Sequence, residues 1–130
     1  MLTHLKLQKP ATEETLQQLT CDTEASLTEK FARARAEQAL WASRPVEERV
    51  EIIARFSQLL EKHRDELAKT LTSEVGKPLQ QSVNEINGAR TRVAFFVEQS
   101  AKVLATETVF EGPGRLEKLA YEPLGVVAVV

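Results

Sequence analysis

The 130-residue chain has very little of several residue types that mark particular classes of protein. It contains one cysteine, which excludes a disulfide within the chain and indicates a reducing compartment. Aromatic residues are 5% of the total, and of only five glycines three lie at Gly112 or later. No apolar run reaches the roughly 18 residues of a membrane span, and the N-terminus lacks a signal peptide's apolar core. These absences predict a cytoplasmic protein that is mainly helical over its first 110 residues.

The charges are nearly balanced. Seventeen basic and nineteen acidic residues give a net charge of -2. This balance argues against a nucleic acid or an anionic membrane as partner, because both require a basic surface. Hydrophobic residues at 42% and charged residues at 28% are the values of an ordinary globular domain.

Hydrophobic spacing predicts three or four helices. The apolar face of the first is formed by Leu27, Phe31, Ala34, Gln38 and Trp41. Ser26 and Glu29 have the spacing of a capping box at its start. Pro45 suits the first turn of the next helix, which is either one long helix or two joined near residues 63–65. Gly76, in "EVGKP", is the expected stop.

A further helix is expected between Leu79 and Leu104, with Gly88 in its middle. A short strand pair is predicted around "KPATEE" in residues 1–22, and residues 115–122 are predicted to form a strand after a turn. The valine-rich run at 126–130 has the pattern of a strand buried on both faces, as in a parallel α/β sheet. With no partner strand in the chain, we interpret the run as the first strand of a domain left out.

No self-sufficient set of catalytic residues is apparent in the sequence. Cys21 is the only candidate nucleophile, and its neighbours Asp22 and Glu24 oppose formation of a thiolate. His63 fits the edge of a helical core better than a catalytic role. Metal-ligand spacings are absent. The "GPG" at 112–114 favours a turn over a phosphate loop, because a dinucleotide fingerprint needs a buried strand before it and a helix after it.

The order of several short motifs resembles the aldehyde dehydrogenase superfamily. "KPATEETLQQL" is similar to that family's N-terminal strand pair, and the segment from "ARARAEQALW" through "EVGKP" is similar to its first helices. "FFVEQSA" resembles an aromatic segment of the family, and "YEPLGVVAVV" resembles the strand that enters the cofactor domain. The resemblance extends from about Leu7 to Val130.

The resemblance implies a mostly α segment of the α/β aldehyde dehydrogenase fold, which contains a Rossmann-like sheet. Residues 1–114 would be the N-terminal helical part of the cofactor-binding domain. Residues 115–122 would be an oligomerisation-type strand, and residues 123–130 the first strand entering the NAD(P)-binding domain. The partner would be a second copy in a homo-oligomer, or a complementing downstream fragment, bound through residues 115–130.

The activity implied is NAD- or NADP-dependent oxidation of a small aldehyde to a carboxylic acid through a cysteine thioester. In the family the nucleophilic cysteine, the glutamate and the oxyanion asparagine lie downstream of "GVVAVV". Cys21 does not match the nucleophile's position. We therefore expect no catalytic and no cofactor-binding residue in this chain, poor binding of NAD or NADP, and no activity of the chain alone.

Three residues are carried over from the resemblance. Glu74 falls where some members place an acidic ligand to a structural monovalent cation, and a plain surface carboxylate is the alternative. Asn84 and Gly88 fall where members line the mouth of the substrate tunnel, and helix packing is the alternative. A non-catalytic helical binding or assembly module derived from the family is the competing hypothesis for the whole chain.

Overall fold

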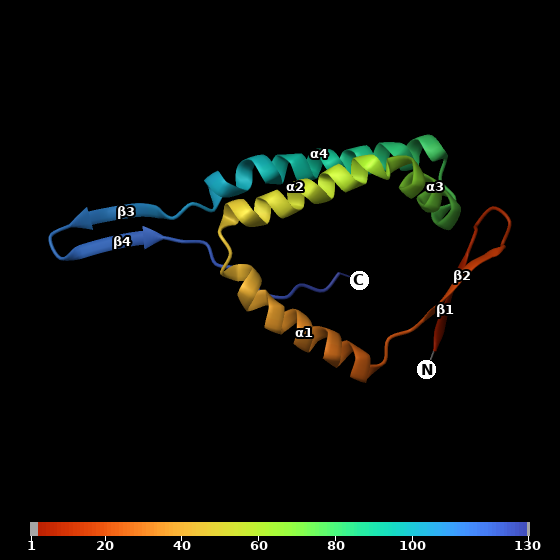
Figure 1. Cartoon of the computed structure of the whole chain (residues 1–130), viewed down its shortest axis with the longest axis horizontal. Coiled ribbons are helices and arrows are strands. Elements are labelled where there is room, and N and C mark those ends of the chain that lie inside the picture. Colours follow the sequence, from red (N-terminus) through yellow and green to blue (C-terminus); the bar gives the residue numbers. More distant parts are fainter. Residues whose placement is uncertain (1–2, 130) are drawn as a thin grey trace.

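The computed structural model describes residues 3–129, which form four helices and two β-hairpins (Figure 1). The elements in chain order are β1 (His4–Gln8), β2 (Thr15–Thr20), α1 (Glu24–Ala42), α2 (Val46–Lys62), α3 (Arg64–Val75), α4 (Leu79–Val103), β3 (Glu107–Gly112) and β4 (Arg115–Leu119). Strand β1 pairs antiparallel with β2, and β3 with β4, in two separate sheets. The predicted fold class, helical with an N-terminal strand pair and C-terminal strands, is confirmed.

The N-cap of helix α1 lies three residues before the predicted capping box. Thr23 is the N-cap: its hydroxyl accepts from the Ser26 N–H at 3.2 Å, and the Ser26 hydroxyl accepts from the Thr23 N–H at 2.9 Å. The prediction of Ser26 and Glu29 as the box is wrong. The Ser26 hydroxyl also donates to Asp22 at 2.8 Å, so the polar residues before α1 hold Ser26 inside the first turn.

The helix is interrupted at His63, which confirms the two-helix alternative for residues 46–75. Gly76 ends α3 with a φ of +78°, a left-handed conformation that favours glycine, and its N–H donates to the Thr72 carbonyl at 2.9 Å. A Cβ added at Gly76 would lie 3.1 Å from the Cβ of Pro10 in the β1–β2 turn. Gly76 therefore serves both the helix stop and the close approach of the N-terminal hairpin.

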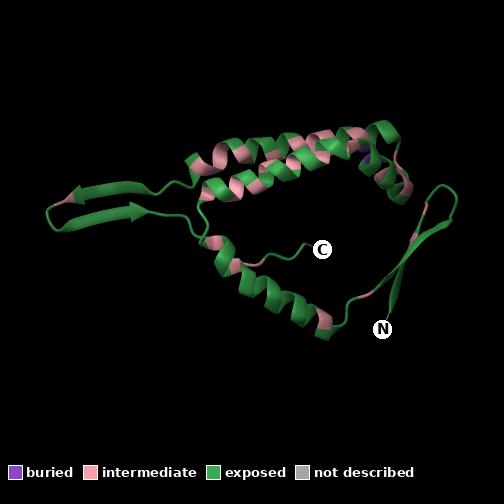
Figure 2. Ribbon diagram, viewed as in Figure 1, coloured by how far each residue is buried: buried purple, intermediate pink, exposed green. Residues whose placement is uncertain are grey.

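Helices α2 and α4 run antiparallel and side by side, and α3 packs on α4 (Figure 1). Within residues 3–129 only Ala68 on α3 and Ser82 on α4 are fully buried (Figure 2). The hydroxyls of Thr72 and Ser82 are hydrogen-bonded at 2.8 Å, which satisfies the buried serine. Helix α1 lies apart from these three helices. The packed core is thus confined to the end of the bundle where α3 meets α4.

Most of the apolar surface is bare. The accessible surface is 10787 Å², whereas a compact monomer of 14.5 kDa has about 6,900 Å². The difference is about 3,900 Å², and exposed apolar side chains lie on the helices as well as on both hairpins. Leu40 on α1 is 63% exposed and Phe96 on α4 is 61% exposed. The helices form as the sequence predicts, but little of their apolar surface is covered.

The C-terminal region differs from the prediction in three ways. The strand expected over residues 115–122 is shorter, ending at Leu119, and its partner β3 was not predicted. Residues 120–129 form no strand here, and the strand expected at 126–130, which needs a partner strand from other polypeptide, stays a prediction. An extended chain becomes a strand only where a neighbour takes its backbone hydrogen bonds, and no other described segment does so. Val130 lies outside the described residues.

Gly76→Ala is expected to lower the free energy of unfolding by more than about 1 kcal/mol, because alanine disfavours the left-handed conformation and would crowd Pro10. Gly88→Ala is the matched control. A Cβ at Gly88 meets nothing within 4 Å, so alanine in mid-helix should raise stability by up to about 1 kcal/mol. Urea denaturation of both variants measures the difference, and equal effects would contradict it.

The two carboxylate oxygens of Asp22 lie 2.6 and 2.7 Å from the Lys30 ammonium. This hydrogen-bonded contact and the Ser26 hydroxyl lower the pKa of Asp22 below its ordinary value. The contribution of Asp22 to stability is therefore present above its ordinary pKa and is lost as the pH falls through the lowered one. In an NMR titration, Lys30→Met should return the Asp22 pKa toward its ordinary value, whereas Arg33→Met on the same helix should leave it unchanged.

Candidate functional site

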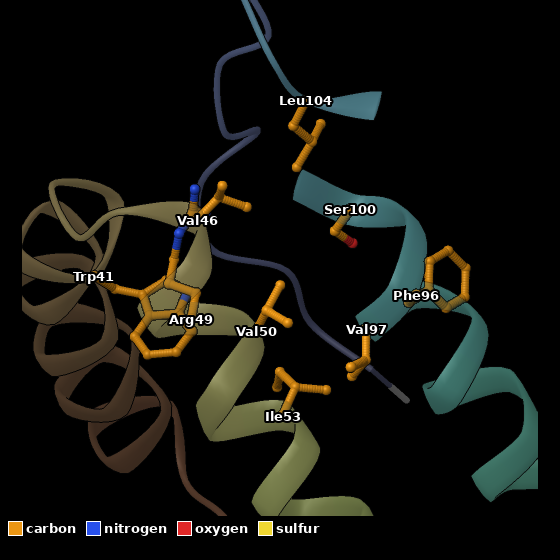
Figure 3. A pocket seen from close by; sticks show the side chains of 9 residues that line it. All are labelled: Trp41, Val46, Arg49, Val50, Ile53, Phe96, Val97, Ser100 and Leu104. Atoms are coloured by element: carbon orange, nitrogen blue, oxygen red, sulfur yellow. The ribbon is translucent and has the colours of Figure 1, made fainter. Parts of the chain in front are cut away.

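A small, mostly apolar hollow lies where α1 ends, α2 begins and α4 ends (Figure 3). Its volume is about 260 Å³. The lining residues are Trp41, Val46, Arg49, Val50, Ile53, Phe96, Val97, Ser100 and Leu104. All but Arg49 and Ser100 are apolar or aromatic. Such a lining suits an apolar ligand or an apolar protein segment.

A second hollow of about 320 Å³ continues along α2 and α4. It is lined by Ala54, Ser57, Gln58, Glu61, Arg90, Ala94 and Val97. Val97 lines both hollows, which therefore adjoin along the line where α2 meets α4. The two hollows together are the α2–α4 groove.

Each hollow contains an arginine with an unsatisfied donor. The Nε atoms of Arg49 and Arg90 are buried and have no hydrogen-bond partner among residues 3–129. Arg90 also forms an ion pair with Glu61 across the groove. A buried N–H without an acceptor costs about 1–3 kcal/mol.

The site residues implied by the resemblance lie elsewhere on α3 and α4, and none of them lines the α2–α4 groove. Glu74 is exposed near the end of α3. Asn84 is exposed on α4, where its side-chain oxygen accepts from Gln80 at 3.0 Å. Gly88 follows one helical turn later and faces open space. The described residues contain no group of three potential metal ligands, so any cation at Glu74 would need further ligands. These three roles remain predictions.

Cys21 follows β2, is half-buried, and its backbone N–H donates to the Thr3 carbonyl at 2.9 Å. The Nδ1 of His63 lies 3.1 Å from Glu66, and that of His4 lies 3.1 Å from the Thr3 hydroxyl. Among the residues that the structure describes, neither histidine is hydrogen-bonded to the thiol. The nucleophile–base pair that thiol catalysis requires is therefore not assembled here.

The glycines at 112 and 114 do not fit a nicotinamide dinucleotide. They lie at the turn between the antiparallel strands β3 and β4, where Gly114 has a φ of +72°. A dinucleotide loop must lead from a parallel strand into a helix whose N-terminus faces the pyrophosphate, and no helix follows β3 in the described chain. The interpretation of 112–114 as a turn is confirmed.

Sequence reasoning missed the two groove arginines. Arg49 lies among Val46, Val50 and Ile53 on the apolar face of α2, where a long charged side chain can pack its stem and extend its charged end to the rim. The one available signal was an arginine within that apolar spacing. The same pattern is common on solvent-facing edges, so the sequence alone did not distinguish the two.

Comparison with known proteins identifies the family to which this chain belongs. The sequence profile described as "Aldehyde dehydrogenase family" matches residues 2–130. The chain therefore belongs to the aldehyde dehydrogenase family and corresponds to its N-terminal segment, as the motifs indicated. It spans about a fifth to a quarter of the length of the curated relatives it matches.

Two curated relatives and one solved structure illustrate the match. The chain is 34% identical to a "Probable aldehyde dehydrogenase" of Pseudomonas sp, over 98% of this chain and 25% of that protein. It is 32% identical to the N-succinylglutamate 5-semialdehyde dehydrogenase of Ectopseudomonas mendocina, over 81% and 21%. The succinate-semialdehyde dehydrogenase of Burkholderia pseudomallei superposes with a TM-score of 0.77 at 29% identity, over 85% and 23%.

Members of the family bind NAD or NADP, as the names of other solved structures state.

The profile match and the superposition confirm the predicted family and its α/β fold. Every helix within the described residues 3–129 is too short or too polar to cross a bilayer.

Arg49→Met is expected to raise the free energy of unfolding of the isolated chain by about 1 kcal/mol, because it removes an unsatisfied buried donor and keeps the apolar stem. Arg92→Met, at an exposed position of α4, is the control and should change stability by less than about 0.5 kcal/mol. Thermal and urea denaturation give both values. A loss of stability on Arg49→Met would reveal a partner for Arg49 within the chain.

Proposed function

We propose that this chain is the N-terminal segment of an NAD(P)-dependent aldehyde dehydrogenase and that the residues which perform the chemistry lie outside it. The observation that carries the proposal is the family match over residues 2–130 of a chain that spans at most a quarter of the relatives reported above. The reaction of the whole enzyme is oxidation of an aldehyde to a carboxylic acid through a cysteine thioester.

The geometry supports a structural role for these residues. The described part of the chain assembles no nucleophile–base pair and no group of three metal ligands, and its 112–114 turn does not fit a dinucleotide. What it does assemble is the α2–α4 groove, which is mostly apolar in its first hollow and mixed in its second and contains two unsatisfied donors. Such a surface serves to hold another protein segment, so the chain supplies scaffold rather than reacting groups.

The substrate class follows from the relatives. The Ectopseudomonas mendocina and Burkholderia pseudomallei proteins are named for semialdehydes. Succinate semialdehyde carries a carboxylate at the end opposite its aldehyde, and we extend this class of substrate to the whole enzyme. Asn84 and Gly88 would lie at the mouth of its substrate tunnel, where the open space beside Gly88 leaves room for a ligand. Glu74 would contribute one oxygen to a monovalent cation.

A second candidate function is a non-catalytic assembly module that keeps the family's N-terminal helices. The observation in its favour is the large accessible surface, about 3,900 Å² beyond that of a compact monomer of this mass, together with the exposed apolar side chains on it. The module would use that surface to bind another protein and would have no part in aldehyde oxidation.

The first test is an assay of the purified 130-residue chain with succinate semialdehyde and either NAD or NADP, following reduced nicotinamide by absorbance. We expect no reduction above the buffer rate, with a complete family enzyme as positive control. Aldehyde-dependent turnover that is lost in Cys21→Ser would overturn the assignment of the chemistry to other residues.

The second test separates the two candidate functions. The genomic sequence that follows the codon for Val130 is read in all three frames. A Trp-Asn-x-Pro segment followed later by a cysteine motif supports the enzyme segment. Unrelated sequence there supports the module.

A further inference from the structure

We draw no further inference here: the strongest candidate, the α2–α4 groove with the buried Nε atoms of Arg49 and Arg90, carries none, because nothing in the described residues shows what covers it.

Discussion

The antiparallel packing of α2 on α4 is the contact on which the rest of the structure depends. Helix α3 folds back against α4 and places Ala68 and Ser82 in the only fully buried positions among the described residues. The turn at Gly76 makes this return possible and brings the N-terminal hairpin against the same end of the bundle. Helix α1 and the β3–β4 hairpin extend away from it. Order in the chain therefore originates in one helix pair.

In a pair of packed helices, each helix covers only the side of the other that faces it. Domains usually consist of two or three packed layers, and the α2–α4 pair is one such layer with a bare face. The groove and its two arginine donors lie along that face, which no other described residue covers. This is consistent with a family segment whose folding and burial depend on other polypeptide.

The sequence predicted local structure well where the cause is local. Spacing of apolar residues gave the helices, and Gly76 gave the stop because few other residues adopt its backbone conformation. Prediction from the sequence failed where the structure of a segment depends on pairing or packing with a distant segment. Strand β3 exists because β4 pairs with it. The buried Nε of Arg49 depends on how α4 crosses α2, which single-sequence spacing does not contain.

Trp41 is the only tryptophan of the chain and stands at the junction of α1 and α2. It lines the hollow at the start of α2 and also the hollow that contains Val126 on the side of α1. Its indole is 39% exposed, so it lies at a boundary between protein and water. The emission of this one ring thus reports the polarity of both hollows at once. The chain carries its own optical probe at the point where covering polypeptide would change the environment most.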